Sequence, residues 1–479
     1  MGLRKNEGLI LLFLSSIVFI IVNNANSLCS QSKILENQSL EKTVVSTKTG
    51  FIEPISAYNV SDSKYNFPLE YRNKQYLWRA GCAETDSSST LQKLLLLIKS
   101  SKTFHILVLG GSETAGVSCE EGDITLKECA WSARFVSYLR SQFSDVNFVL
   151  LNVAVGGTTI SVALPSISQW LGLVDEPALV LIDFIVNDTF DYQDSKISNN
   201  ILASYEQVIQ TMKRLRPEFI HMFINACGLP RCHYFNNIIK TLATFRNIPV
   251  VSYYDMVEIF HGIYGDPVWD SFFGIKGPHP RWEVHQLIAD LAWKCLQWNW
   301  SNNQRKFAEG NAIVASDKEM IDRLRMCDVP TSVFNSLNAS CDSLIQKNGW
   351  NLYEDRPGKP GWITEKNKGG TISFNINFGL YPRLTVVYLR SYENLGKASL
   401  SFSDILEKEV ILDGLYSSIS PKISQAFLLT MEVSRENCWQ PELGLSGCLG
   451  FGIQPYSSHI LEIRMLDEQK FKLLSVTAC

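Results

Sequence analysis

Between residues 91 and 298, short and almost continuous apolar runs alternate with segments whose apolar positions follow a helical period. The apolar runs predict buried strands at 104–110, 147–155, 178–186, 219–226 and 248–254. The segments between them predict helices at 90–100, 133–143, 163–173, 201–215, 236–246 and 282–298. Strands that are apolar throughout are buried on both faces. The pattern therefore predicts an α/β domain, a parallel sheet with helices on both sides.

The pattern changes after about residue 300, where short β-rich segments are separated by Gly, Pro, Ser and Asp turns. They predict strands at 371–378, 383–392, 398–404, 409–414, 425–433, 459–466 and 471–478. This is typical of an antiparallel all-β sandwich. Two domains also fit the length of 479 residues, which is too long for one ordinary core.

The N-terminus has the pattern of a secretory signal. Arg4 and Lys5 precede the apolar run 8–22, and the small residues Ala25 and Ser27 follow. We expect cleavage after Ser27, with a retained signal anchor as the alternative, although a bilayer span needs about 20 apolar residues. The whole chain is then divided into a signal peptide or anchor (1–27), an irregular lead-in packed on the first domain (28–90), the α/β domain (91–300), a linker (301–345) and the β-rich domain (346–479).

The cysteines and glycosylation sequons agree with a secreted protein or one in the lumen of the endoplasmic reticulum or Golgi. Twelve cysteines are present, and several fall in close pairs that we interpret as local disulfides: Cys119 and Cys129, Cys227 and Cys232, Cys327 and Cys341, Cys438 and Cys448. Asn-X-Ser/Thr sequons occur at Asn37, Asn59, Asn299 and Asn338, and a fifth at Asn187.

Charge and motifs exclude several function classes. The formal net charge of −4 gives no basic balance that would favour nucleic acid, and the chain meets a membrane only if its N-terminal segment is retained. Paired CxxC units and a Walker lysine motif are absent, and the stretch VLGGSETAG lacks the G-x-G-x-x-G spacing of a dinucleotide site. Nothing in the sequence indicates a metal or an organic cofactor.

Four candidate functional residues stand where predicted strands end or the last helix begins. Ser112 follows Gly-Gly after the first strand, Gly157 follows the second, Asn187 follows the third, and His279 precedes the last helix. Ligands of parallel sheets bind at the carboxyl ends of the strands, so we expect these residues to meet at one edge. Taken alone, each also fits a simpler role as a turn or helix-cap residue.

The order Ser, Gly, Asn, His resembles the SGNH hydrolase superfamily, also called GDSL esterases/lipases. The matching blocks are GGS at 110–112, NVAVGGTT at 152–159, VND at 186–188 and the His-Pro of GPHP at 279–280. The resemblance covers about residues 100–298, and its block forms are similar to a eukaryotic secretory-pathway branch. It implies a three-layer α/β/α sandwich with a flavodoxin-like parallel sheet.

The same resemblance implies a serine esterase. Ser112 would be the nucleophile and His279 the base that takes its proton. The backbone N–H groups of Ser112 and Gly157 and the side-chain amide of Asn187 would form the oxyanion hole.

One position departs from the family pattern. The acidic residue that usually stands three before the histidine is replaced by Lys276, and a cation there disfavours an imidazolium. Asp270 is the preferred substitute, with Asp266, Asp183 from beneath, or a main-chain carbonyl as alternatives. A degraded site that only binds its ligand is the fourth outcome.

The favoured function is a secreted or lumenal esterase that removes acyl groups, above all acetyl, from a glycan, or hydrolyses another small ester. A catalytically silent glycan-binding protein, a lipid esterase and an O-acyltransferase remain as alternatives. Three tryptophans of the C-terminal part could stack on sugars, although a buried core position is the commoner fate of such residues: Trp350, Trp362 and Trp439.

Overall fold

The computed structural model describes residues 75–82, 88–119, 126–175, 177–191, 195–228, 232–264, 279–301, 331–335, 343–355, 360–364, 370–379, 382–405, 408–415, 424–433 and 451–478. The signal segment, the sequons at Asn37, Asn59 and Asn338, and the cysteine pairs of 327 with 341 and 438 with 448 lie outside these residues. Among the helices that are described, none is long and apolar enough to cross a membrane.

The first domain is built on a parallel sheet of five strands in the order β2-β1-β3-β4-β5. The strands are β1 (Thr103–Gly110), β2 (Asn147–Asn152), β3 (Ala178–Asp183), β4 (Ile220–Asn225) and β5 (Val250–Ser252). The predicted parallel sheet is confirmed, and its order is the flavodoxin-like one. From β1 the chain first adds β2 on one side and then β3 on the other side. Ligands of doubly wound sheets bind at this switch point, outside the carboxyl ends of the strands.

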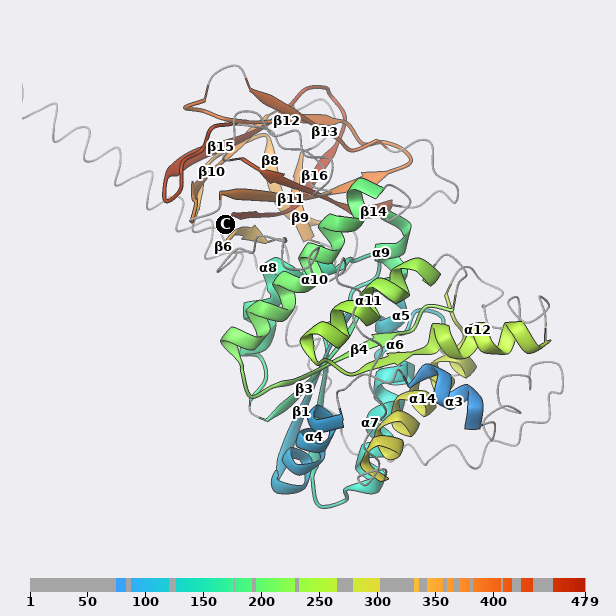
Figure 1. Cartoon of the computed structure of the whole chain (residues 1–479). Coiled ribbons are helices and arrows are strands. Elements are labelled where there is room, and N and C mark those ends of the chain that lie inside the picture. Colours follow the sequence, from blue (N-terminus) through green and yellow to red (C-terminus); the bar gives the residue numbers. More distant parts are fainter. Residues whose placement is uncertain are drawn as a thin grey trace, which may run out of the picture.

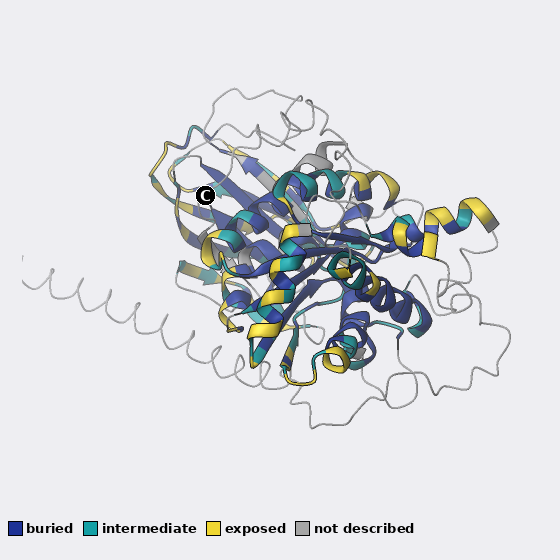
Figure 2. Ribbon diagram, turned by 60° about the horizontal axis from the view of Figure 1, so that its bottom comes forward, coloured by how far each residue is buried: buried dark blue, intermediate teal, exposed yellow. Residues whose placement is uncertain are grey.

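Helices cover both faces of this sheet (Figure 1). One face is covered by α4 (Ser88–Ser100), α7 (Trp131–Gln142), α12 (Tyr253–Tyr264) and α14 (Trp282–Ser301), and the other by α8 (Ile160–Gly172), α10 (Ser195–Leu215) and α11 (His233–Arg246). Side chains of β1 alternate between the two cores: Ile106 and Val108 face the first, Leu107 and Leu109 the second. The strands are therefore buried on both faces, and exposed positions lie on the outer sides of the helices (Figure 2).

Besides the single-turn helices α5 (Ser112–Ala115) and α6 (Leu126–Cys129), which were not predicted, three helices differ from the sequence prediction. Helix α3 (Gln75–Gly81) lies in the segment predicted as an irregular lead-in, and it buries Leu77 and Trp78 in the first core. Helices α9 (Ile185–Asp191) and α12 begin inside the runs 178–186 and 248–254, which were predicted as strands to their ends. An apolar run alone does not show where a buried strand turns into a buried helix.

The second domain is a β-sandwich, as the sequence predicts. One antiparallel sheet has the order β13 (Glu409–Asp413), β12 (Lys397–Phe402), β15 (Ser458–Met465), β10 (Thr371–Asn377) and β7 (Leu344–Asn348). The other has β14 (Ser424–Glu432), β11 (Arg383–Ser391), β16 (Phe471–Ala478), β9 (Pro360–Thr364) and β8 (Trp350–Glu354), and β6 (Thr331–Asn335) pairs with β16. Strand β6 lies in the segment predicted as a linker, and β7 begins at the end of that segment.

Both sheets of the sandwich contribute to one core. Phe374 and Leu400 come from the first sheet, and Val386 and Leu473 from the second. Trp350 and Trp362 belong to this core with 1% and 3% exposure, so the idea that they stack on sugars is wrong. Trp439 lies outside the described residues. The sandwich meets the α/β domain where β6 and β16 contact α8 (Figure 1).

Three disulfides lie within the described residues. The predicted pairs Cys119–Cys129 and Cys227–Cys232 are confirmed. A third bond, Cys82–Cys295, joins the end of α3 to α14 across a sequence separation of 213 residues. No local spacing indicates this pair, because its two cysteines meet only when α14 packs beside α3.

The long-range disulfide gives a stability prediction. Replacing both Cys82 and Cys295 by Ser should lower the free energy of unfolding by about 2–5 kcal/mol, because a crosslink that closes a long loop restricts the unfolded chain most. Thermal unfolding monitored by circular dichroism, without reductant, measures this. The matched control is the double Ser variant of Cys227 and Cys232, whose separation of 5 residues closes a short loop. Equal losses in the two variants would contradict the loop-length argument.

Candidate active site

The first strand ends in two glycines because the space around them is filled. A Cβ on Gly110 would lie 2.3 Å from Thr114 Oγ1, and one on Gly111 would lie 2.2 Å from Asn187 Nδ2. Gly111 caps the short helix α5 (Ser112–Ala115), and the chain leaves this helix through Gly116 at φ 87°. The sequence Gly-Gly-Ser thus brings the first residue of α5 to the carboxyl end of the sheet.

The segment after β2 runs beside this turn. The N–H groups of Val153 and Val155 donate to the carbonyls of Val108 and Gly110, at 3.0 and 3.1 Å. Gly156 then lies against the serine, since a Cβ on it would be 3.5 Å from Ser112 Cβ. Gly157 has φ 76°, a conformation that favours glycine.

Asn187 lies in α9, the helix that follows β3, and closes the third side. Its Nδ2 donates to the Thr158 carbonyl at 2.7 Å and faces Gly111. An amide nitrogen carries two hydrogens, so one remains for another acceptor. Because the amide is half-buried and bonded in this way, Asn187 is a poor glycosylation site in the folded domain.

His279 completes the cluster from the segment before α14. Its Nε2 is 2.9 Å from Ser112 Oγ, and Ser112 is only 9% exposed. Burial lowers the pKa of His279 from its ordinary value, which favours the neutral imidazole at neutral pH. A neutral ring with its hydrogen on Nδ1 accepts the serine proton at Nε2.

The structure does not bring Asp183 to this histidine. Its Oδ2 accepts a hydrogen bond from the Thr114 hydroxyl at 2.6 Å, and Oδ1 lies 3.5 Å from the Ala226 N–H. Asp266, Asp270 and Lys276 are outside the described residues. Within the described part of the chain, the serine is the hydrogen-bond partner of His279.

Asp183 is nevertheless part of the electrostatics of the site. Burial raises its pKa to about 7, against the opposing effect of the hydrogen bonds from Thr114 and Ala226. Between about pH 4 and pH 7 the folded state holds a proton here that the unfolded state has lost. This group therefore makes the free energy of unfolding fall as the pH rises through that window.

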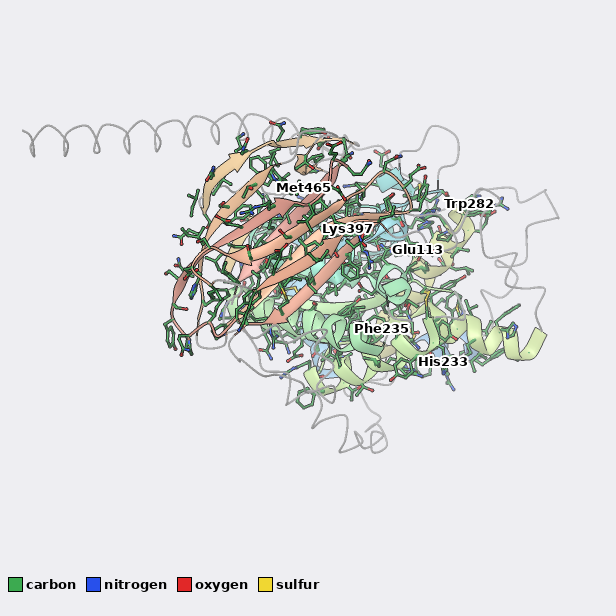
Figure 3. The ribbon with its side chains drawn as sticks, turned by 90° about the horizontal axis from the view of Figure 1, so that it is seen from above. Glu113, His233, Phe235, Trp282, Lys397 and Met465 are labelled. Carbon is green, nitrogen blue, oxygen red and sulfur yellow. A yellow bond between two sulfur atoms is a disulfide. The ribbon has the colours of Figure 1, made fainter. Side chains whose placement is uncertain are left out.

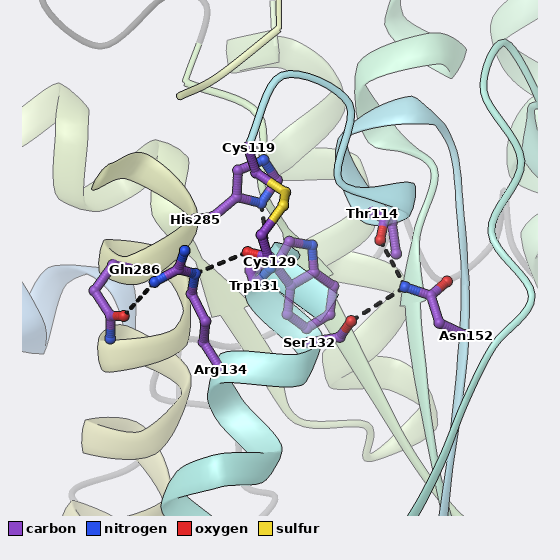
Figure 4. The surroundings of a disulfide bond; sticks show 9 residues. All are labelled: Thr114, Cys119, Cys129, Trp131, Ser132, Arg134, Asn152, His285 and Gln286. Carbon is purple, nitrogen blue, oxygen red and sulfur yellow. Dashed lines mark hydrogen bonds between the residues drawn. A yellow bond between two sulfur atoms is a disulfide. The ribbon is translucent and has the colours of Figure 1, made fainter. Parts of the chain in front are cut away.

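Two residues of the site were missed by the sequence analysis. Asn152, at the end of β2, donates through Nδ2 to the Thr114 carbonyl at 2.8 Å (Figure 4). Asp188 accepts from the N–H of Ile160, the first residue of α8, at 3.1 Å and from the Tyr205 hydroxyl at 2.8 Å. Both stand inside the recognised blocks, and a polar residue at the end of an apolar strand was the available signal.

His285 is a buried histidine of the core. It lies in α14 with no exposed surface, and its Nδ1 accepts from the Trp131 N–H at 3.2 Å (Figure 4). Burial lowers its pKa to about 3, so it stays neutral. His285 is therefore a core residue of α14 and not part of the candidate site.

The arrangement is suited to nucleophilic chemistry without a metal ligand set. Figure 3 labels Glu113, next to the serine, and Trp282, three residues after His279, on the α/β domain. The described residues contain no group of three His, Cys, Asp or Glu side chains that could hold a metal ion. A serine hydroxyl, a neutral imidazole and fixed N–H donors can together attack a carbonyl and stabilise the oxyanion.

Comparison with known proteins relies on the fold. No family model matches the sequence, and no curated protein matches it. A two-domain esterase (CEX) active on acetylated mannans, co-crystallised with mannopentaose, is 18% identical with a TM-score of 0.58, over 84% of this chain and 97% of that one.

Other solved structures match 40% of this chain. Axe2, an acetylxylan esterase from Geobacillus stearothermophilus, is 16% identical over 40% of this chain and 93% of its own, with a TM-score of 0.32. A member of the lipolytic G-D-S-L family from Veillonella parvula is 16% identical over 40% of this chain and 97% of its own, with a TM-score of 0.31. Over most of its length the chain thus has the fold of this two-domain esterase, and the order of Ser112, Gly157, Asn187 and His279 resembles that of the SGNH (GDSL) hydrolases.

Proposed function

We propose that this protein is a serine esterase that hydrolyses O-acyl esters, chiefly acetyl esters, on a glycan. The observation that carries the proposal is the hydrogen bond between Ser112 Oγ and His279 Nε2, 2.9 Å long, at the sheet end where Gly157 and Asn187 also lie. A secreted or lumenal location is part of the proposal, since disulfides persist in oxidising compartments.

In the first half-reaction, Ser112 Oγ attacks the ester carbonyl carbon while its proton passes to His279 Nε2. The carbonyl oxygen becomes an oxyanion that accepts hydrogen bonds from the N–H groups of Ser112 and Gly157 and from the Asn187 amide. The intermediate collapses by breaking the bond to the sugar oxygen. That oxygen takes the proton from His279 and leaves as a hydroxyl.

In the second half-reaction, water replaces the sugar. His279 takes a proton from the water as it attacks the acyl-serine carbonyl, and the same donors stabilise the second oxyanion. Breaking the bond to Ser112 Oγ releases the carboxylic acid, and the proton on His279 returns to the serine. An acceptor sugar in place of water would make the same site an acyltransferase.

The choice of a short acyl group and a glycan has two supports. Ser112 is 9% exposed, so a small acyl group reaches it more easily than a long chain does. A solved structure that matches 84% of this chain is an esterase active on acetylated mannans. Lipid esters and sugar acceptors are outcomes that substrate profiling distinguishes.

The nucleophile and base give the first activity prediction. Ser112→Ala should lower kcat for p-nitrophenyl acetate by at least about 10³-fold, because the attacking oxygen is lost. In the wild type, kcat/KM should fall as the pH drops through the His279 pKa, and the midpoint should lie below the ordinary value because burial disfavours the imidazolium.

Ser166→Ala serves as the control, since Ser166 is a fully buried serine of α8. Assays between pH 4 and pH 8 with the acetate and butyrate esters, and with acetylated mannan, cover the alternatives. Wild-type protein that equals Ser112→Ala on every ester but still binds the polysaccharide would establish a glycan-binding protein.

The oxyanion donor gives the second prediction. Asn187→Ala should lower kcat by about 10²–10³-fold with a smaller change in KM, because its amide meets charge that develops in the transition state. Steady-state kinetics measure this, and mass spectrometry of the purified protein checks that Asn187 carries no glycan. A kcat within threefold of the wild type would remove Asn187 from the oxyanion hole.

The orientation of the histidine gives the third prediction. We propose Asp270 as the carboxylate that holds the Nδ1–H of His279, so Asp270→Asn should lower kcat by about 10²–10⁴-fold. Asp266→Asn is the matched control from the same segment. A large loss in Asp266→Asn alone would transfer the role to that residue, and no loss in either would indicate a Ser–His dyad.

A further inference from the structure

Thr114 occupies an unusual position two residues after Ser112. It belongs to α5, which has only four residues and contains a single turn. One turn of helix has little stability of its own, because fixing its dihedral angles costs more than its few hydrogen bonds return. The position of Ser112 therefore depends on what holds α5 from outside.

The first hold is on the Thr114 side chain. Its hydroxyl donates to Asp183 Oδ2 at 2.6 Å and lies 3.3 Å from the Asp183 carbonyl. Thr114 is 0% exposed and Asp183 3% exposed, so water does not replace this bond. The same Asp183 carbonyl accepts from the N–H of Gly111 at 3.3 Å.

The second hold is on the Thr114 backbone. Asn152 Nδ2 donates to the Thr114 carbonyl at 2.8 Å (Figure 4). Asn152 Oδ1 accepts from the N–H of Ala154 at 3.0 Å. Ala154 begins the segment that leads to Gly157. One buried amide therefore joins the nucleophile helix to the loop that carries an oxyanion donor.

The side chains of Asp183 and Asn152 come from the two strands on either side of β1, the strand that leads to Ser112. Asp183 is the last residue of β3 and Asn152 the last of β2, and both strands pair with β1. Thr114 is thus fixed from both neighbours of its own strand. A buried hydroxyl that only needed a partner would be satisfied by its own helix, as Thr189 is through the Ile185 carbonyl at 2.7 Å.

We propose that Asp183 and Asn152 are positioning residues that fix α5 through the hydroxyl and the backbone carbonyl of Thr114. They thereby set the distances from Ser112 Oγ to His279 and to the oxyanion donors. This arrangement, the Thr114 clamp, rests on the proposed serine esterase function. It touches no substrate. Its effect is on the reacting atoms, because a displacement of about 1 Å in such a site can cost about 10²-fold in rate.

The test uses the full chain and the rate at which a fluorophosphonate acylates Ser112. Thr114→Val keeps the shape but removes the hydroxyl, and we expect its second-order inactivation rate constant and its kcat to fall about 10–100-fold with KM within about threefold. Thr114→Ser restores a hydroxyl and should recover most of the rate. Thr189→Val, another buried threonine, is the control and should stay near the wild type.

Melting temperatures separate positioning from folding, since Thr114→Val and Thr189→Val each remove one buried hydroxyl. Asn152→Leu tests the second hold and should show the same split between kcat and KM. Inactivation and kcat of Thr114→Val equal to the control, at matched melting temperatures, would overturn the clamp. Wild-type protein that is not labelled at Ser112 at all would instead overturn the proposed function.

Discussion

The pairing of β1 with β2 on one side and β3 on the other is the constraint on which this site depends. Because all three strands are parallel, their carboxyl ends reach the same edge, and Gly110 stands opposite Asp183 in the register. Strand β1 is held there by burial in two cores, where each fully buried Val, Leu or Ile contributes about 1.5–3 kcal/mol. Residues 75 positions apart, Ser112 and Asn187, become neighbours because of this pairing.

At that edge the glycines provide space for neighbouring side chains, and the buried polar groups fix the geometry of the loops. Gly110 and Gly111 leave room for Thr114 and Asn187, and side chains larger than hydrogen would push these residues away. Buried polar groups are costly unless they are hydrogen-bonded, and here Asp183, Asp188 and Asn152 are bonded to groups of the neighbouring elements. The polar network therefore stabilises one arrangement of the loops around Ser112.

Most of the fold could be predicted from the sequence, because period and burial are local signals. The apolar runs predict all five parallel strands, and the later β-rich segments predict seven strands of the sandwich. The starts of α9 and α12 were missed because an apolar run looks alike as buried strand or buried helix. Strands β6 to β9 were missed because each is only five residues long, and β6 and β9 are fixed by pairing with β16, which is distant in the sequence.

The sequence by itself determined which residue types stand at the strand ends, the local disulfide pairs and the SGNH-like order of Ser112, Gly157, Asn187 and His279. Only the tertiary structure decided the 2.9 Å contact of Ser112 with His279, the bond from Thr114 to Asp183 and the Cys82–Cys295 disulfide. The same is true of the burial of Trp350 and Trp362. Spacing along the chain specifies composition and local turns, whereas contacts between distant segments arise only when helices and sheets pack and exclude water.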